Sequence, residues 1–225
     1  MSKRLKAARE KIEVGKLYKI EEAIELVKET SQVKFDASVE VHLNLGIDPQ
    51  KGEQIVRGSV ILPKGTGKKL KIAAFVPEEQ IKKAKKAGAD LAGGDDLIKE
   101  IKKTSKTDFD IAVTVPEMMK NLAVIARILG QKGLMPNPKT GTISSDLEKM
   151  IGELKKGKVF YKNDETSNIH MMIGKTSFPS KDLIENFNTF LKSLRKLKPS
   201  TLKTTFINSI TITSSMGPGI KIQPN

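Results

Sequence analysis

The sequence predicts a mixed α/β (α+β) protein with two domains, in which a discontinuous two-layer α+β domain is interrupted by a Rossmann-like α/β domain. Three observations indicate this fold class. Residues 38–46 alternate apolar and polar side chains, which is typical of a strand with one buried face. Residues 70–155 alternate strand and helix patterns, as a small sheet with parallel members covered by helices does. Polar, glycine-containing breaks at residues 64–69 and 155–158 separate these regions and are candidate linkers.

The first flank, residues 1–65, begins with two predicted helices, over residues 3–13 and 21–30, where apolar side chains recur at helical spacing. The strand over residues 38–46 follows, and a further strand over residues 54–62 ends at a proline. The strand 38–46 has an apolar face of Val39, Val41, Leu43 and Leu45, and a polar face of Glu40, His42 and Asn44.

The insert, residues 66–158, has strand and helix patterns in alternating order. Pro116 opens one of its helices, and Ser144, Ser145 and Asp146 offer caps for the last one. The expected strands cover residues 70–76 and 109–115, and the expected helices cover residues 77–87, 95–103, 116–129 and 145–155.

The second flank, residues 159–225, completes the first. A strand pair over residues 158–162 and 168–174 is expected around a polar turn, followed by a helix over residues 180–197 and a strand over residues 205–214. Neither flank alone has enough elements to bury a good core. The sequence therefore permits one domain made of residues 1–65 and 159–225, with residues 66–158 inserted into it.

The composition excludes several classes of protein. The 225 residues carry 40 basic and 26 acidic side chains, a net charge of +14, and include no cysteine. A chain without cysteine has neither disulfides nor thiolate metal sites, which fits a reducing cytoplasm. The charged start is unlike a signal peptide, and no apolar run is long enough to span a membrane. The excess positive charge favours a polyanionic partner, above all a nucleic acid.

The sequence gives little support for an enzyme, so no catalytic residue, metal ligand or cofactor is expected. Residues 65–69 faintly resemble a phosphate-binding loop, but Leu62 and Lys69 stand where the full motif needs a glycine and a hydroxyl. A flexible linker is the better interpretation. His42 and His170 are the only histidines, and neither has a ligand nearby in the sequence. This favours structural or RNA-contacting roles over a zinc site or a catalytic base.

Lysine clusters at residues 82–86 and 99–106 lie on predicted helices of the insert. They form either a solvated face or a diffuse nucleic-acid surface. Charge does not decide which domain binds, because the insert carries 19 basic and 12 acidic residues, net +7, and the flanks carry 21 and 14, also net +7.

The C-terminal strand is more informative, because its hydroxyl residues alternate with isoleucines. It ends in a glycine-rich turn that contains Met216, while Phe35 stands between charged residues just before the strand 38–46. Each of these apolar side chains is either an edge of the core or, if the two meet in space, part of an apolar platform edged by hydroxyls and lysine. Such a platform suits recognition of folded RNA through sugars, stacked bases and phosphates.

Residues 128–143, with the sequence ILGQKGLMPNPKTGTI, narrow the identity most. Gly130 and Gly133 can end a helix, and Pro136 and Pro138 forbid its continuation. The order of residues matches the signature of the large-subunit ribosomal protein family L-one, and the chain resembles the bacterial members of that family over essentially its whole length. Other resembling stretches, in the same order, are residues 34–36, 39–42, 45–49 and 215–218. We interpret residues 128–143 as a structural or interdomain element.

The resemblance implies a non-enzymatic protein of the large ribosomal subunit, whose interrupted domain binds 23S rRNA at the mobile stalk while the linkers let the insert swing. It also implies that the protein assists release of deacylated tRNA from the exit site and represses translation of its own operon mRNA. A cytoplasmic, ribosome-associated chain is expected, monomeric when free and without a membrane partner. Phe35, Ser215, Met216 and Gly217 match the family's RNA site, and Lys34, Ser38, Glu40, His42, Asp164, His170 and Ser209 are expected beside them. At position 215 the family commonly has threonine, and serine keeps the hydroxyl but loses a methyl contact.

Two other classes of function are the alternatives. An enzyme that uses the insert as a nucleotide site would need an intact phosphate loop, a dinucleotide-binding glycine fingerprint or an acid–base pair, and the sequence offers none of them. A basic chaperone or transcription factor would need a recognition helix with a reading face of Arg, Asn or Gln, and no predicted helix presents one.

Overall fold

The computed structural model describes residues 3–13, 15–202 and 204–224. The chain divides into two compact units, one of Met1–Gly67 with Val159–Asn225 and the other of Lys68–Lys158. The sequence placed these limits at residues 65/66 and 158/159. Helices and strands are mixed throughout, so the predicted α/β (α+β) fold class is confirmed.

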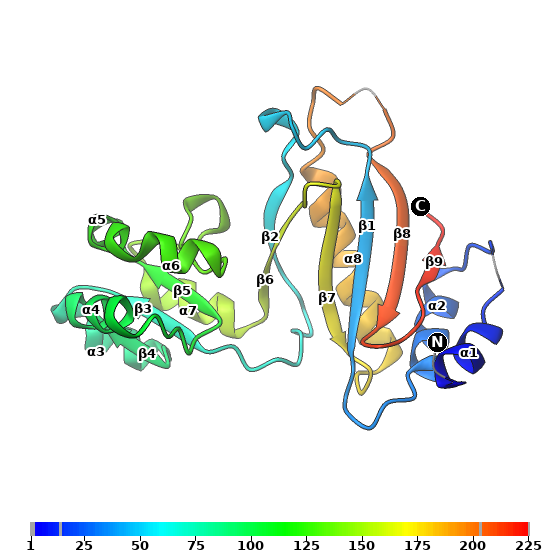
Figure 1. Cartoon of the computed structure of the whole chain (residues 1–225), viewed down its shortest axis with the longest axis horizontal. Helices are drawn as coiled ribbons and strands as arrows, with labels where there is room; N and C mark the ends of the chain where they lie inside the picture. Colours follow the sequence, from blue (N-terminus) through cyan, green and yellow to red (C-terminus); the bar gives the residue numbers. More distant parts are fainter. Residues whose placement is uncertain (1–2, 14, 203, 225) are drawn as a thin grey trace. The chain divides into compact units, whose positions relative to one another are not determined.

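The first unit is built on a four-stranded antiparallel sheet with the order β7-β1-β8-β9 (Figure 1). Its central strand β1 buries alternate side chains, as the sequence predicted. The strands are β1 (Ser38–Leu45), β7 (Asn168–Lys175), β8 (Ile207–Ser214) and β9 (Ile220–Ile222). The short β9, not predicted, pairs with β8 through Ile210–Ile222 and Ile212–Ile220.

Two helices cover one face of this sheet. α2 (Ile20–Thr30) contacts β8 and β9, and α8 (Ser180–Lys196) contacts β7 and α2; α8 lies behind the sheet in Figure 1. Ile24 and Phe190 are fully buried between the layers with the apolar face of β1. The unit therefore has a sheet layer and a helix layer, and among the described residues no helix covers the other face of the sheet.

The N-terminal helix α1 (Lys3–Glu10) ends three residues before the predicted limit at residue 13. The strand predicted over residues 54–62 is likewise shorter. A 3₁₀ turn, η1 (Gly52–Gln54), comes first, and β2 covers Arg57–Ile61.

The predicted pairing of strands 158–162 and 168–174 is wrong. β6 (Lys158–Lys162) pairs with β2, whereas β7 pairs with β1. Contacts distant in sequence explain this: the buried Tyr161 stacks edge-on against Phe190 of α8 at 5.2 Å between ring centroids. In addition, the backbone N of Asn163 donates to Val56 O (3.0 Å), and the backbone N of Val56 donates to Asn163 Oδ1 (2.9 Å). These bonds hold β6 beside β2.

The boundary between the two units, at residues 67/68, lies within the predicted flexible linker over residues 64–69, but the first residues of that stretch are bonded to the first unit. Asn186 of α8, which is fully buried, accepts a hydrogen bond from the backbone N of Lys64 (3.1 Å) and donates one to Gly65 O (2.9 Å). Thr66 is buried as well, and Lys68 Nζ donates to Asp110 Oδ1 of the second unit (2.6 Å). Residues 64–67 therefore belong to the first unit, and residue 68 already belongs to the second.

The second unit contains a three-stranded parallel sheet with the order β4-β3-β5. α3 packs against α7, and α4 packs against the segment that follows β5. The strand β4 was not predicted, because three residues are too few to show a period. The elements are β3 (Ile72–Phe75), α3 (Glu78–Ala87), β4 (Leu91–Gly93), α4 (Asp95–Thr104), β5 (Ile111–Thr114) and α7 (Leu147–Lys155). The predicted cap of α7 is present: Asp146 Oδ1 accepts from the backbone N of Lys149 (3.1 Å).

The helix predicted over residues 116–129 is not continuous. The segment alternates between 3₁₀ and α geometry and reaches four residues into the signature stretch 128–143 before it ends. Its pieces are η2 (Pro116–Met118), α5 (Met119–Leu122), η3 (Ala123–Ile125) and α6 (Ala126–Gln131). Tight i→i+3 turns of this kind interrupt the regular helical ladder.

The signature stretch is a compact structural loop around η4 (Pro138–Thr140). The carbonyl of Asn137 accepts from the hydroxyls of Thr140 (2.9 Å) and Thr142 (3.2 Å), which are both buried. The backbone N of Thr114 on β5 donates to Thr142 O (3.1 Å), and Ile143 forms a parallel bridge with Thr114. The stretch thus extends the edge of the parallel sheet beside β5.

Candidate nucleic-acid interface

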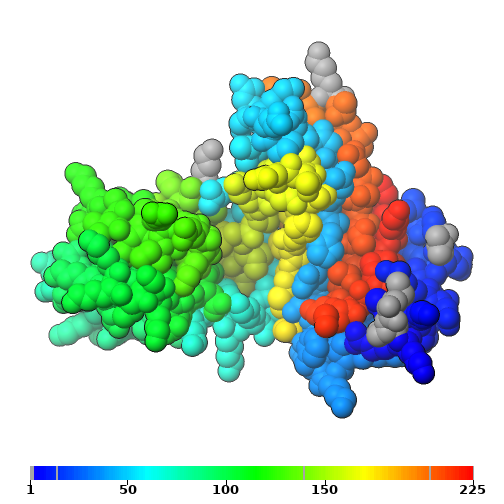
Figure 2. Space-filling model, viewed as in Figure 1, coloured from blue at the N-terminus to red at the C-terminus, as the bar shows by residue number. Residues whose placement is uncertain are grey.

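The face of the four-stranded sheet that lies opposite α2 and α8 is polar and open to solvent. Figure 2 shows β7 in yellow, β1 in blue and β8 in orange side by side at the surface. The register places side chains of neighbouring strands opposite one another: Asn44 faces Asn168 and Ser209, His42 faces His170 and Thr211, Glu40 faces Met172 and Thr213, and Ser38 faces Lys175. On β9, Lys221 pairs with Thr211. This combination of hydroxyl, amide, imidazole and ammonium groups is suited to sugar and phosphate contacts.

At one end of this face, the segment before β1 meets the turn after β8. The backbone N of Ser215 donates to Ser38 O (2.9 Å), and the backbone N of Ser38 donates to Ser215 Oγ (3.3 Å). Phe35 and Met216 flank this junction with 56% and 71% of their surfaces exposed. The alternative that they are edges of the core is therefore wrong.

The turn itself is tight. Met216 has a left-handed backbone (φ 65°), which few residues other than glycine adopt. A side chain at Gly217 would collide with Ser214 Oγ beneath it, and the backbone N of Gly217 donates to Ser214 O (2.8 Å). Gly217 is needed for this close approach, which holds Met216 outward.

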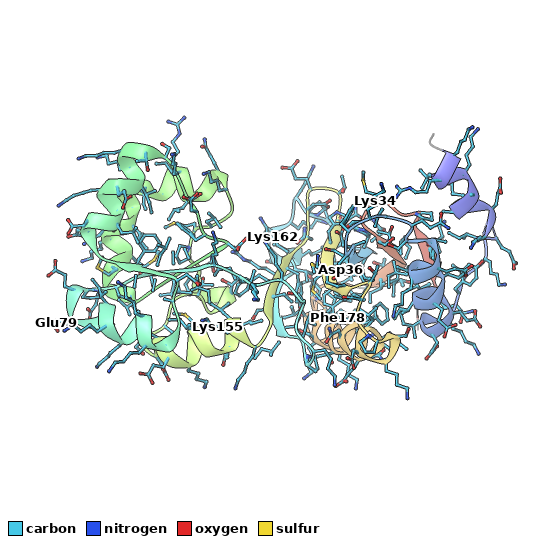
Figure 3. All side chains as sticks on the ribbon, turned by 90° about the horizontal axis from the view of Figure 1, so that it is seen from below. Lys34, Asp36, Glu79, Lys155, Lys162 and Phe178 are labelled. Carbon is cyan, nitrogen blue, oxygen red and sulfur yellow. The ribbon has the colours of Figure 1, made fainter. Side chains whose placement is uncertain are left out.

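Asp36 anchors the segment before β1. Its carboxylate accepts from Thr176 Oγ1 (3.2 Å), from the backbone N of Ser177 (3.1 Å) and from Ser177 Oγ (2.9 Å). Desolvation alone would raise the pKa of Asp36, but these hydrogen bonds and the charge of Lys175 together lower it below its ordinary value. Figure 3 labels Lys34 and Asp36 in this segment and Phe178 in the connection from β7 to α8. Lys34 is exposed.

The middle of the face holds the two histidines. His42 Nδ1 lies 2.7 Å from His170 Nδ1, so one ring donates and the other accepts. Burial lowers the pKa of His42 below its ordinary value, and the charge of His170 lowers it further, whereas Glu40 opposes the shift. His42 Nε2 lies 3.9 Å from Glu40 Oε2, and His170 Nε2 lies 3.4 Å from Asp164 Oδ2.

Asp164 organises the turn between β6 and β7. Its Oδ1 accepts from the backbone N of Asn168 (2.7 Å) and of Thr166 (2.9 Å). The hydrogen bond from Asn168 is the main reason why the pKa of Asp164 is lowered to about 2, with Thr166 and His170 contributing and desolvation opposing. Asp164 is therefore ionised at neutral pH, and it shapes the turn as well as facing His170.

All eleven residues expected at the RNA site lie on this face or at its ends, in three groups. One group surrounds the Ser38–Ser215 junction, one is the row of Glu40, His42, His170 and Asp164, and Ser209 lies opposite Asn44 at the far end. Lys175, Met172 and Lys221 share the face but were missed, because only the strand register shows which side chains are neighbours. The alternation of polar residues along the strand 168–174 was the available signal for Met172.

The candidate phosphate loop does not have the geometry of one. Residues 65–69 are followed by an extended segment and then β3, with no helix N-terminus directed at the loop. Across residues 3–13, 15–202 and 204–224, no three histidine, cysteine, aspartate or glutamate side chains are grouped to hold a metal ion. In the same part of the chain, no helix is long and apolar enough to cross a membrane. The lysines of α3 and α4 are exposed and stand opposite the buried Ala84, Ile98 and Ile101.

Comparison with known proteins identifies the family of the chain. Residues 27–218 match the ribosomal protein L1p/L10e family. The chain is 48% identical to the large ribosomal subunit protein uL1 of Mesoplasma florum, over 100% of this chain and 99% of that one. It is 48% identical to the uL1 protein of Mycoplasma capricolum, over 99% and 98% of the two chains, and 46% identical to that of Corynebacterium diphtheriae, over 100% and 95%. These relatives are ribosomal proteins and not enzymes. The chain therefore belongs to the ribosomal protein L1p/L10e family.

Proposed function

We propose that this chain is a structural component of the large ribosomal subunit and that the open face of its four-stranded sheet binds a folded segment of 23S rRNA. One observation carries the RNA-binding part of the proposal. Two large apolar side chains, Phe35 and Met216, are held in solvent on either side of a hydrogen-bonded junction at the end of a polar sheet face. A side chain with no core to enter is available to a partner.

The chemistry of the face fits RNA. Hydroxyls and amides such as those of Thr211, Thr213 and Asn44 can exchange hydrogen bonds with ribose 2′-OH groups and phosphates, while Phe35 and Met216 can contact sugars and unstacked bases. Lys34, Lys175 and Lys221 supply positive charge around it. The net charge of +14 on the whole chain adds a long-range attraction to RNA.

The same surface serves a second RNA in this proposal. A face that recognises shape, sugars and phosphates rather than base edges accepts any RNA that presents the same fold. Repression of translation would follow if the operon mRNA of this protein contained such a structure. Two points support this: the chain resembles the family, and in the part of the chain that the structure describes no helix on this face could enter a groove and read bases.

A role in releasing deacylated tRNA from the exit site is proposed on the two-unit organisation. The chain passes between the units only at residues 67/68 and 158/159. With one unit bound to rRNA, the other would be able to move with the tRNA.

The test of the main proposal is a competition experiment. Fluorescently labelled rRNA stalk segment is bound to the protein at fixed salt and displaced by the unlabelled segment or by a random RNA duplex of equal length. We expect the matched segment to compete at concentrations at least about a hundredfold lower, since specific binding exceeds the electrostatic background by such factors or more. Equal competition by both RNAs would reduce the interface to a non-specific basic surface.

A further inference from the structure

The N-terminal helix reaches both segments that carry the exposed apolar side chains. Arg4 of α1 donates through Nη1 to Gln32 O (3.1 Å) and through Nη2 to Met216 O (3.1 Å). One planar guanidinium thus joins the segment that leads to Phe35 with the turn that carries Met216. A guanidinium is suited to this because its donors have a fixed fork geometry. Figure 1 shows the turn between β8 and β9 next to α1.

The helix that carries Arg4, α1, and the residues that follow it pack against the rest of the first unit. Ala8 is buried at 3% exposure, and Ile12 packs against the core of the first unit. Lys11 Nζ forms an ion pair with Glu29 Oε1 of α2 (2.6 Å), and the backbone N of Glu13 donates to the hydroxyl of Tyr18 (2.9 Å). The backbone N of Tyr18 in turn donates to Lys221 O beside β9 (3.0 Å). These contacts, made by Ala8 and by residues 11–13, tie α1 and the segment after it to α2 and to the core of the first unit.

Other hydrogen bonds hold the two segments beside their tips. Asp36 accepts from Thr176 and Ser177, and Thr213 Oγ1 donates to Gly217 O (3.3 Å) and Pro218 O (3.1 Å). The hydroxyl oxygens of Ser31 and Ser214 are buried and bond to no described residue, so they do not tie these segments down. The Ser38–Ser215 bonds and the bond from Gly217 to Ser214 hold the base of the turn. Among the hydrogen bonds within the described ranges, the one from Arg4 is the bond that reaches the carbonyl of Met216, whose left-handed backbone is strained.

We infer that Arg4 is a positioning residue for RNA binding: it sets Phe35 and Met216 at the spacing that RNA meets, and it does so without contacting RNA itself. This rests on the proposed RNA-binding function. Fixing two loops before binding removes the ordering cost that RNA would otherwise have to offset. Arg4 is half-buried, and two of its five N–H donors are directed at the carbonyls of Gln32 and Met216.

Substitutions of Arg4 should affect RNA binding differently from substitutions of a cation that contacts phosphate. Arg4→Met, which keeps the stem and removes the donors, should weaken binding of the rRNA stalk segment roughly tenfold, the effect of losing charge-assisted hydrogen bonds. The slope of log K against log salt should not change, since no phosphate contact is lost. Arg4→Lys should restore little, because one ammonium cannot reproduce the fork that spans both carbonyls. Arg9→Met is the matched control: Arg9 lies on the same helix, is exposed, and its side chain bonds to no described residue.

A second measurement needs no RNA. In the free protein, Arg4→Met should increase hydrogen exchange at the backbone amides of residues 32–35 and 215–217, while Arg9→Met should not. Unchanged exchange in Arg4→Met would overturn the inference. So would a salt slope that falls by about one unit with full rescue by lysine, since that pattern identifies a phosphate contact.

The outcome also distinguishes this inference from the function on which it rests. If Met216→Ala weakens rRNA binding and Arg4→Met does not, positioning by Arg4 is refuted and the interface stands. If neither variant affects rRNA binding, the proposed interface itself is wrong. Urea unfolding of Arg4→Met shows whether a loss of affinity for rRNA merely reflects a lower folded fraction. If Arg4→Met is folded and its affinity for rRNA is unaltered, the positioning role of Arg4 is refuted.

Discussion

Met216 combines two properties that oppose stability, a left-handed backbone and an exposed apolar side chain. Left-handed geometry in a residue other than glycine costs about 1 kcal/mol or more. The fold gains no buried apolar surface in return, so the benefit is expected to come from a partner. The same reasoning applies to the exposed side chain of Phe35.

Removing these side chains should separate binding from stability. We expect Met216→Ala or Phe35→Ala to weaken rRNA binding by about 1–3 kcal/mol, the range for a base stacked on a side chain. The free energy of unfolding in urea should change by less than about 0.5 kcal/mol, because both side chains are exposed. Val124→Ala in the second unit is the control, since Val124 is also exposed, at 57%. A loss of binding in the control equal to that of Met216→Ala would place the interface elsewhere.

Ser215 gives a finer test of the same junction. Its hydroxyl accepts from the backbone N of Ser38, and in the RNA complex it can also meet a ribose 2′-OH. Ser215→Thr keeps that hydroxyl, so we expect affinity to be retained, whereas Ser215→Val should lose it. Calorimetric titration with the rRNA segment measures both. Equal affinities for the two variants would show that the hydroxyl is not used.

The His42–His170 pair predicts a pH dependence. The pKa of His42 in the folded protein lies below its ordinary value of about 6.5. Between these two pKa values, the unfolded chain therefore binds more protons than the folded protein. The contribution of His42 to the free energy of unfolding is therefore fully present above about pH 6.5 and is lost as the pH falls through the pKa of His42 in the folded protein. NMR titration should give His42 a midpoint below 6.5, and His170→Gln should raise that midpoint, because the charge of His170 is one of its causes. A midpoint at or above 6.5 in the unmodified protein contradicts the prediction.

At the scale of elements, periodicity predicted the strands and helices whose burial repeats regularly. β1 and α2 are present within a residue of their predicted limits, because each has one apolar face over two or more periods. The predicted pair of strands 158–162 and 168–174 failed because the hairpin rule considers only neighbours in sequence. The actual partners, β2 for β6 and β1 for β7, are distant in the chain: Val41 of β1, for example, pairs with Met171 of β7. The broken segment 116–131 also has helical spacing, so its 3₁₀ turns were invisible to periodicity.

For the same reason, some residues of the candidate site could be predicted from the sequence and others could not. The polar face of β1 and the Met216 turn follow from the sequence, because alternation and exposed glycine-rich turns are local patterns. Arg4, Lys175 and Lys221 do not follow, since their places beside the site depend on register and on contacts between distant segments.

Asn186 is a buried polar side chain through which α8 holds the backbone of two other segments. It bonds to Lys64, Gly65 and the backbone carbonyl of Ile173 (2.8 Å) from a fully buried position on α8. Asn186→Ala leaves those backbone groups unpaired, so we expect a loss of about 2–3 kcal/mol in the free energy of unfolding, measured in urea. Asn188→Ala, on the exposed side of the same helix, should change it by less than about 0.5 kcal/mol. Equal losses in both variants would show that helix propensity, and not the buried bonds, is responsible.

The chain passes from one unit to the other at two places, which we call crossings, and their flexibility determines how far the units can move. Residues 64–67 are bonded to α8, so the first crossing is confined to the step from Gly67 to Lys68. The second follows Gly157, where α7 has ended. Gly67 and Gly157 both have positive φ values, 75° and 97°, which other residues rarely adopt. Glycines at both crossings are a typical means of absorbing backbone rotation.

We therefore expect the distance between the units to vary in solution. Because the chain has no cysteine, spin labels can be placed at Lys196→Cys on α8 and Lys103→Cys on α4, two exposed helical positions in different units. Pulsed electron paramagnetic resonance should give a distance distribution clearly broader than that of a control pair within the first unit, Lys28→Cys with Lys196→Cys. Gly157→Ala, which strains the second crossing, should shift or narrow the broad distribution and leave the control unchanged. A single narrow distance for the inter-unit pair, unaltered by Gly157→Ala and by rRNA, would mean that the crossings are rigid, and the proposed movement of the second unit with tRNA would have no structural basis.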